Sequence, residues 1–234
     1  MKLVNTTLEK GKGPIIGKLR NITLIEGDMQ IGMRIFLSTD IEELIERDER
    51  FSKSNFGSRK NYSIAIVILQ KRLIFDNSLI LMKHTIYTIM NLQSCYDRQL
   101  PNVGSIVEEL VGCNRNAMKL YTKIMPKLEH YVSTGYGISD GFYGGNTELA
   151  NTGQGNKFSG NMYWDISCLI IKQLEISKLR ICFHSLATRI KVLRAAVSFV
   201  DDNNLAVDGQ NAVNNIQVIL NQFNSLHTAT GGKM

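Results

Sequence analysis

The spacing of apolar residues along the chain predicts a mixture of helices and strands. Residues 210–226 repeat apolar side chains at i, i+3 and i+7, beginning with Val213 and Ile216, which is typical of an amphipathic helix. Residues 84–92 carry β-branched side chains and apolar residues on both phases, so we predict a buried strand ending at or shortly after Asn91. The same criteria predict a strand at 19–26, helices at 41–51, 62–75, 103–110, 117–130 and 161–179, and two short strands within 194–205 that meet at Asp-Asp-Asn-Asn.

Two stretches show little periodicity. Residues 1–17 are polar and glycine-rich, which predicts an irregular entry to the fold. Residues 135–160 hold eight of the 19 glycines and predict a long, pliable connection. No internal repeat is present, and no shift in composition divides the chain into independent domains.

The composition is that of a folded protein with a modest positive charge. With 234 residues, 44% of them hydrophobic, the chain can bury a core. The 27 Lys and Arg against 21 Asp and Glu give a net charge of +6, which mildly favours a polyanionic partner. We find no secretory signal and no apolar stretch long enough to span a membrane, so we expect an intracellular protein, cytoplasmic or nuclear, with no membrane partner.

Other common motifs add little chemistry. Glycines beside Lys12 and Lys18 do not complete a P-loop, and the adjacent Glu108 and Glu109 are expected on a solvated helix face. The cysteines form no C-x-x-C pair and no zinc-like spacing with histidine, so we expect reduced, mostly buried thiols at Cys95, Cys113, Cys168 and Cys182.

The most distinctive chemistry is a pair of adjacent carboxylates, Asp201 and Asp202, which follow Phe199 and Val200 where the two short strands meet. Adjacent carboxylates repel each other unless a cation lies nearby or both point into water. Carboxylate oxygens are hard ligands that suit Mg²⁺. An exposed, Asp-rich turn is the alternative interpretation of this pair alone.

Three segments, in this order, resemble the palm motifs of reverse transcriptases. Residues 91–97 resemble D-x-x-x-x-(F/Y)-D, residues 152–159 resemble G-x-Q-G-x-x-x-S, and residues 199–202 resemble (F/Y)-x-D-D. The SCYDRQLPNVGSIVEE phrase is closer to retrotransposon-encoded enzymes than to retroviral ones. Weaker similarities, at residues 17–22, 55–59 and 229–233, extend the resemblance to the fingers strand, the G-F-R turn and the Gly-Gly-Lys turn of the family, and so across nearly the whole chain.

The resemblance implies a right-hand polymerase fold of the α/β (α+β) class. It would comprise a palm with an antiparallel sheet backed by helices, at residues 84–234, and partial fingers at residues 1–83. The helical thumb of the family would be absent, and other domains of a larger polyprotein are compatible with this arrangement. Without a thumb, apolar surfaces would be left exposed, and we expect poor solubility or association with a partner chain.

The resemblance also implies a site and its ligands. Asp201 and Asp202, with the residue at position 91, would be catalytic and would hold two Mg²⁺ ions, or Mn²⁺ in their place, helped by the backbone carbonyl of Leu92. The partners would be an RNA template, a DNA primer and deoxynucleoside triphosphates. The implied nucleotide contacts are Lys18 and Arg20 at the triphosphate, Tyr96 beneath the sugar, and Gln154 and Gly155 against the incoming nucleotide.

Position 91 departs from the family because it is Asn rather than Asp. An amide keeps one neutral oxygen but lacks the negative charge that binds a divalent cation. Two functions therefore remain open: RNA-directed DNA polymerase activity by a two-metal mechanism, or binding of nucleic acid without catalysis by a decayed retroelement fragment. A third interpretation, accidental similarity in an unrelated protein, predicts that Asn91 and Asp201 lie on distant elements.

Overall fold

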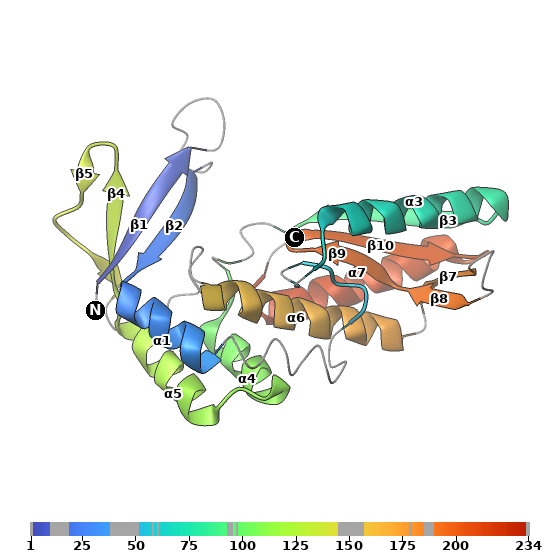
Figure 1. Cartoon of the computed structure of the whole chain (residues 1–234). Helices are drawn as coiled ribbons and strands as arrows, with labels where there is room; N and C mark the ends of the chain where they lie inside the picture. The colour runs from blue at the N-terminus through green and yellow to red at the C-terminus, as the bar shows by residue number, and fades with distance from the viewer. Residues whose placement is uncertain are drawn as a thin grey trace. The chain divides into compact units, whose positions relative to one another are not determined.

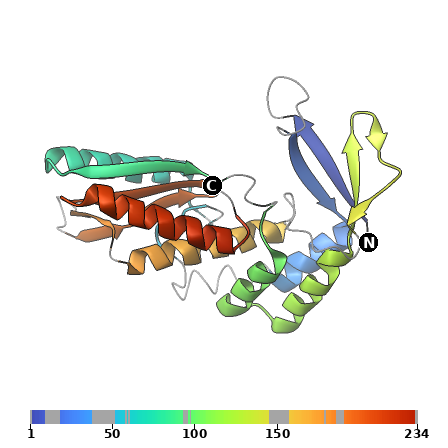
Figure 2. The same cartoon turned by 180° about the vertical axis from the view of Figure 1, so that it is seen from behind.

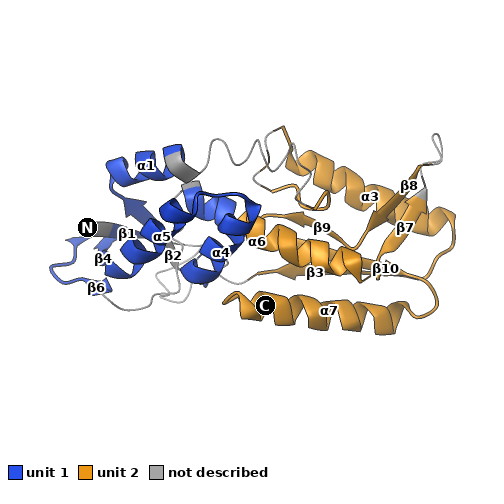
Figure 3. Ribbon diagram, turned by 90° about the horizontal axis from the view of Figure 1, so that it is seen from below, with its two compact units in different colours: residues 1–48, 96–163 blue, residues 49–95, 164–234 orange. Residues whose placement is uncertain are grey.

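The computed structural model describes residues 2–9, 19–37, 52–57, 59, 61–92, 96, 98–144, 157–177, 179–184 and 190–232. The chain forms two compact units that interleave along the sequence (Figure 3). Unit 1 comprises residues 1–48 and 96–163, and unit 2 comprises residues 49–95 and 164–234. Each unit therefore combines two stretches that are far apart in the sequence.

Unit 1 contains a small mixed sheet. Its order is β2-β1-β4-β5, with β6 also paired to β4. The strands are β1 (Lys2–Glu9), β2 (Leu19–Ile25), β4 (Glu129–Thr134), β5 (Gly137–Ile138) and β6 (Tyr143–Gly144). β1 is antiparallel to β2 and parallel to β4. A buried polar network joins these strands, since Thr23 Oγ1 donates to Asn5 Oδ1 at 2.8 Å and Asn5 Nδ2 donates to His130 Nδ1 at 3.0 Å.

The described part of unit 1 contains three complete helices, and local chemistry explains the end of one and the start of another. They are α1 (Gly27–Leu37), α4 (Pro101–Val111) and α5 (Arg115–Ile124), the last followed by a 3₁₀ turn at Met125–Lys127. α4 ends at Gly112, whose φ of +115° is a left-handed conformation that glycine adopts without strain. The side chain of Asn114 caps α5 by accepting a hydrogen bond from the N–H of Asn116 at 2.8 Å.

Unit 2 contains an antiparallel sheet of order β3-β10-β9 and a separate β7-β8 hairpin. Its strands are β3 (Thr85–Asn91), β7 (Ile181–His184), β8 (Lys191–Arg194), β9 (Ala196–Phe199) and β10 (Asp202–Asp208). Helices α3 (Ile64–Ile80) and α7 (Ala212–Ala229) lie on opposite faces of the sheet (Figures 1 and 2). Helix α6 (Lys157–Ile176) begins in unit 1 and continues into unit 2. Under α3, the core contains Phe56, Val67, Ile74, Ile181, Val197 and Ala206.

The structure confirms the expected strand at 84–92 and the helices near 62–75, 103–110, 161–179 and 210–226. It also confirms free thiols, since Cys113 and Cys168 are buried and Cys182 is half-buried; Cys95 lies outside the described residues. Within the described chain, no helix has the length and apolarity needed to cross a membrane.

Several local expectations are wrong. Residues 2–9 form β1 rather than an irregular entry, because this strand is stabilised by partners distant in sequence. The helix expected at 117–130 ends at Ile124, just before Pro126, and Glu129 already belongs to β4. Glu108 is only 1% exposed, and Cys113 Sγ donates to its Oε2 at 3.0 Å, so this carboxyl does not lie on a solvated face.

Other elements were not anticipated. Helix α1 and the β7-β8 hairpin have no counterpart in the sequence predictions. The glycine-rich region at 135–160 includes β5, β6 and the start of α6. The helix expected at 41–51 lies wholly outside the described residues.

Candidate functional site

The tandem aspartates lie at a tight hairpin between β9 and β10. Phe199 pairs with Asp202, so Val200 and Asp201 form the two-residue turn. The sequence had suggested a tip at Asp-Asp-Asn-Asn, but Asp202 and the two asparagines after it belong to β10. Val200 has a φ of +55°, which is rare for a β-branched residue and indicates a strained conformation that surrounding contacts must hold.

Asn91 lies beside these aspartates. In the pairing of β3 with β10, Asn91 is directly opposite Asp202. One residue further, the N–H of Leu92 donates to the carbonyl of Asp201 at 3.2 Å. The predicted juxtaposition of position 91 with the tandem aspartates is confirmed, and the alternative that places them on distant elements is wrong.

The side chains at this corner form a small, solvent-accessible set of oxygen donors. Asp202 and Asn91 are exposed, Asp201 is half-buried, and Leu92 is buried. Among the described residues, no Lys, Arg or His forms an ion pair with either aspartate, and no three acidic, His or Cys side chains cluster as a metal site. Two carboxylates with an amide and backbone carbonyls fit a hard cation such as Mg²⁺, but the third carboxylate of a full two-ion site is missing.

Two buried asparagines support the hairpin from within β10, and the sequence reasoning missed their role. Asn203 Nδ2 donates to the carbonyl of Asp201 at 3.2 Å, and Asn204 Nδ2 donates to the carbonyl of Val197 at 3.1 Å. Both side chains are fully buried, and their Oδ1 atoms have no partner in the described structure. The two asparagines directly before the apolar Leu-Ala-Val run of β10 were the available signal, because buried amides are retained where they make specific hydrogen bonds.

A segment at residues 52–57 holds β9 from its outer side, and we call it the 52–57 bracket. The N–H of Phe56 donates to the carbonyl of Ser198, and the N–H of Ser198 donates to the carbonyl of Ser54, both at 2.9 Å. The hydroxyls of Ser52 and Ser54 donate to Glu175 Oε1 at 3.0 and 2.5 Å. The bracket therefore fixes β9 to the end of α6.

The bracket also reaches the strained turn. A Cβ atom added to Gly57 would lie 2.5 Å from the backbone nitrogen of Val200, closer than real Cβ contacts allow. Only glycine permits this approach without a shift of the backbone. The turn that carries Asp201 is thus held by close backbone packing.

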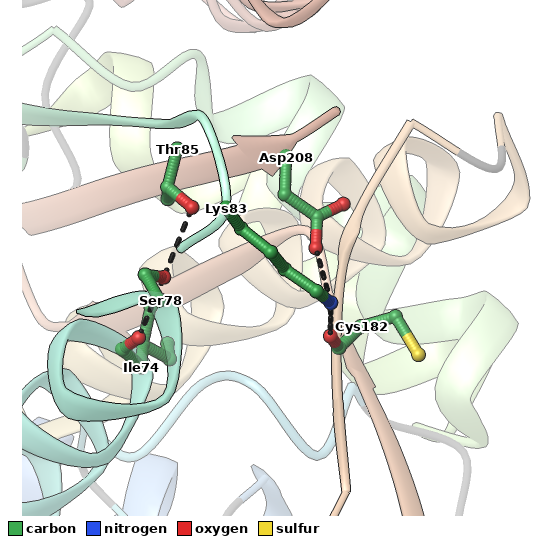
Figure 4. Close-up of polar contacts among 6 residues, drawn as sticks. All are labelled: Ile74, Ser78, Lys83, Thr85, Cys182 and Asp208. Carbon is green, nitrogen blue, oxygen red and sulfur yellow. Dashed lines mark hydrogen bonds and ion pairs between the residues drawn. The ribbon is translucent and has the colours of Figure 1, made fainter. Parts of the chain in front are cut away.

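The opposite end of β10 is fixed by a second polar cluster (Figure 4). Lys83 Nζ donates to Asp208 Oδ2 at 3.1 Å and to the carbonyl of Cys182 at 2.8 Å. Thr85 Oγ1 donates to Ser78 Oγ at 2.9 Å. These contacts join the α3–β3 connection to β10 and β7, and they help to set the register that places Asn91 opposite Asp202.

The remaining predicted site residues lie in unit 1 or outside the described residues. Tyr96 belongs to unit 1, where its ring centroid lies 5.2 Å from that of Tyr163. The backbone of Arg20 pairs with Leu8 in the sheet of unit 1. The other predicted positions, Lys18, Gln154, Gly155 and the Gly-Gly-Lys residue Lys233, lie outside the described residues.

Comparison with known proteins finds likeness in structure alone. No family model and no curated protein matches the sequence. Telomerase from Candida albicans, in complex with a TWJ fragment of telomeric RNA, is similar with a TM-score of 0.61 at 10% identity, over 98% of this chain and 40% of that one.

Two structures of telomerase from Candida tropicalis are also similar to this chain. Apo telomerase truncated from its C-terminal domain gives a TM-score of 0.52 at 12% identity, over 94% of this chain and 46% of that one. Telomerase in complex with a TWJ fragment of telomeric RNA gives 0.55 at 11% identity, over 98% of this chain and 39% of that one. The chain thus spans less than half the length of these telomerases. At this identity the likeness concerns the fold, and the chain has the mixed α/β, right-hand polymerase fold of telomerase reverse transcriptase.

Proposed function

We propose that the chain is an RNA-directed nucleotidyl-transfer domain of the reverse-transcriptase type, in which Asn91 limits the rate of the reaction. The observation that carries this proposal is the cross-strand pairing of Asn91 with Asp202, next to the hydrogen bond between Leu92 and Asp201. In a right-hand polymerase fold, this is the kind of corner where acids from two strands converge. Unit 2 would then be the core of the palm.

The chemistry expected of this corner is attack of a primer 3′-hydroxyl on the α-phosphate of a nucleotide. Bound Mg²⁺ would stabilise the attacking oxygen and the leaving pyrophosphate. The carboxylates of Asp201 and Asp202 would hold the cation, while the Leu92 carbonyl and the Asn91 amide would add neutral oxygens. Asn91 would hold it less tightly than an acid, because its side chain contributes no charge.

The test is primer extension on an RNA template with Mg²⁺ or Mn²⁺, comparing the natural chain with Asn91→Asp and Asp202→Asn. We expect Asn91→Asp to raise incorporation at least ~10-fold, the equivalent of about 1.4 kcal/mol in the barrier. Asp202→Asn should abolish incorporation. If neither the natural chain nor Asn91→Asp extends a primer, the catalytic proposal is wrong.

Binding of nucleic acid without turnover, by a decayed retroelement fragment, is the second candidate function. Asn91 favours it because an amide weakens metal binding, and the net charge of +6 suits a polyanion. The chain should bind an RNA–DNA hybrid at low salt, with log K falling linearly as log salt rises. Absence of binding at low salt would exclude this function.

The proposed function implies particular partners, nucleotide contacts and an origin. Two of the similar telomerase structures hold a fragment of telomeric RNA, which favours RNA as a partner here, and within the proposal this RNA would be the template. Lys18 and Arg20 would contact the triphosphate, Tyr96 the nucleotide sugar, and Gln154 and Gly155 the incoming nucleotide. A DNA primer, deoxynucleoside triphosphates, a retrotransposon origin and an intracellular location complete the proposal.

A further inference from the structure

Helix α5 of unit 1 carries a basic side chain at every fourth residue (Figure 3). Arg115, Lys119 and Lys123 lie in the helix, and Lys127 follows in the 3₁₀ turn. All four residues are exposed. Residues four apart on a helix are neighbours on one face, so these side chains form a line of positive charge, which we call the α5 stripe.

The opposite face of α5 is buried and fixes the direction in which the stripe points. Met118 is 0% exposed and Tyr121 is 3% exposed. The ring of Tyr121 also contacts that of Phe158 edge-on, with 5.2 Å between the centroids. Because this apolar side packs inside unit 1, the α5 stripe is presented to solvent by a helix whose own orientation is set by the core.

The positive charge of the stripe is not offset by nearby acids. Residues 110–128 contain four basic residues and no Asp or Glu. Arg115 Nε lies 3.6 Å from Glu109 Oε2, but 74% of the arginine side chain is exposed, and such pairs are weak. Within the described part of the chain, Lys119, Lys123 and Lys127 form no ion pair.

This arrangement is unfavourable for the isolated helix. Like charges at i and i+4 destabilise a helix, and α5 places Arg115 before Lys119 and Lys119 before Lys123 within only ten residues. A helix that only had to face water would gain from acids between the bases. The repulsion disappears when an anion neutralises the stripe, so the pattern indicates a polyanionic ligand.

The spacing of the charges fits a chain of phosphates. A rise of 1.5 Å per residue separates successive bases of the stripe by about 6 Å along the helix, close to the separation of neighbouring phosphates along an RNA strand. Lysine binds phosphate as a point charge and does not read the bases. Asn116 is exposed three residues before Lys119 and adds an amide donor on the same side.

The other common anionic ligand of a basic helix is a lipid surface, and α5 does not suit it. An interfacial helix needs an apolar face that can enter the bilayer. The structure describes every residue of α5, and Leu120 is the one large apolar side chain exposed on it. The remaining apolar face is committed to the core through Met118 and Tyr121.

We propose that the α5 stripe binds the phosphate backbone of RNA, independently of base sequence, with Lys119 and Lys123 at the centre of the contact. The inference rests on the proposed function, which makes RNA the expected polyanion. It adds a binding surface in unit 1 to the candidate corner in unit 2. The stripe would hold the RNA and take no part in the chemistry at that corner.

The test measures binding of a single-stranded RNA of mixed sequence by the full chain and by Lys119→Gln/Lys123→Gln. Loss of two phosphate contacts should weaken binding at low salt at least ~10-fold and reduce the slope of log K against log salt by about 1.4. The double variant should melt no lower than the natural chain, because it removes like-charge pairs and glutamine is a good helix former.

Two matched variants separate the stripe from net charge and from side-chain shape. Lys71→Gln/Lys191→Gln removes the same charge from unit 2 and should leave the salt slope unchanged. Lys119→Arg/Lys123→Arg keeps the charge of the stripe and should bind RNA as the natural chain does. Vesicles containing phosphatidylserine supply the lipid comparison and should not bind.

The outcomes distinguish this inference from the proposed function. If the natural chain binds RNA and both glutamine double variants weaken it equally, or neither does, the stripe is not the contact and the inference is wrong, while the proposed function stands. Vesicle binding that depends on Lys119 and Lys123, without RNA binding, would assign the stripe to lipid and also overturn it. RNA binding through the stripe in a chain that extends no primer would support the inference and contradict only the catalytic proposal.

Discussion

At the residue scale, position 91 controls the electrostatics of the candidate site. Its side chain is an amide directly opposite the carboxylate of Asp202, with Asp201 in the adjacent turn. The natural pair avoids repulsion between acids on facing strands. Replacing the amide with a carboxylate would create that repulsion and would also complete a set of three acids. The single substitution Asn91→Asp should therefore lower the stability of the cation-free chain while it strengthens cation binding.

Asn91→Asp should destabilise the cation-free chain by about 0.5–1 kcal/mol at neutral pH, because like charges would face each other across the strands. Thermal unfolding in EDTA measures the loss, and added Mg²⁺ should recover it. Asn224→Asp, at an exposed position of α7, is the control and should show no recovery. Equal melting of Asn91→Asp and the natural chain in EDTA would show that residues 91 and 202 do not interact.

Gly57 is a second position where a single atom matters. Gly57→Ala should cost about 1–3 kcal/mol in the free energy of unfolding, because the new Cβ would overlap the backbone of Val200. Gly160→Ala is the matched control, since a Cβ there meets nothing within 4 Å and alanine favours the helix. Urea unfolding measures both variants. An unchanged free energy of unfolding in Gly57→Ala would mean that the bracket does not hold the turn.

At the element scale, the register of β3 against β10 brings the site residues together. The register is fixed near Asn91 by Leu92 and Asp201, and near Thr85 by Lys83 and Asp208. Because side chains alternate along a strand, a slip of one residue would turn Asp202 to the other face. The polar cluster at the far end of the sheet therefore contributes to the geometry of the site.

Lys83→Met should lower the free energy of unfolding by about 1–2 kcal/mol, because Asp208 would lose its charged partner in a position where only 17% of its side chain is exposed. Arg72→Met removes an exposed pair with Asp76 in α3 and should cost less than ~0.5 kcal/mol. Chemical denaturation compares the two variants. Equal losses of unfolding free energy would mean that the Lys83–Asp208 pair stabilises the fold no more than an exposed ion pair does.

The sequence predicted elements whose signal is local. Helix α7 and strand β3 have clear periodicity or β-branched composition, and the polymerase resemblance placed Asn91 beside the aspartates. Elements that depend on distant partners were missed, above all β1, which pairs in parallel with β4. Short-range patterns contain no information on such pairing, and the same limit hid the contact of Gly57 with Val200.

At the scale of the whole molecule, the two units interleave, and each buries a histidine. In unit 1, His130 accepts from Asn5, and in unit 2, His227 stacks on Phe223 in α7. Burial lowers the pKa of both imidazoles, so both are held neutral in the folded chain. The stability of both units should therefore depend on pH in the same direction.

The chain should lose stability as the pH falls below about 6.5, the ordinary pKa of histidine in an unfolded chain. The unfolded chain then binds protons that the folded chain, with lowered pKa values, does not yet bind, so acid favours unfolding. His130→Gln keeps an acceptor for Asn5 without titrating and should reduce the slope of stability against pH. Urea unfolding between neutral and mildly acidic pH measures it, and an unchanged slope would contradict the assignment to His130.

Large apolar side chains are exposed on several of the described elements. On α3 alone, Ile68, Phe75 and Leu79 are all exposed. A helix that is apolar on most sides is normally covered.

The proposed function depends on Asn91, Asp201 and Asp202 forming the cation-binding corner of a polymerase-type site. Titration with Mn²⁺, followed by electron paramagnetic resonance, tests it most directly in the natural chain, Asn91→Asp and Asp202→Asn. We predict at least ~10-fold tighter binding for Asn91→Asp, because a third carboxylate joins the site, and loss of binding for Asp202→Asn. Mn²⁺ affinity that is the same in all three proteins would contradict the claim.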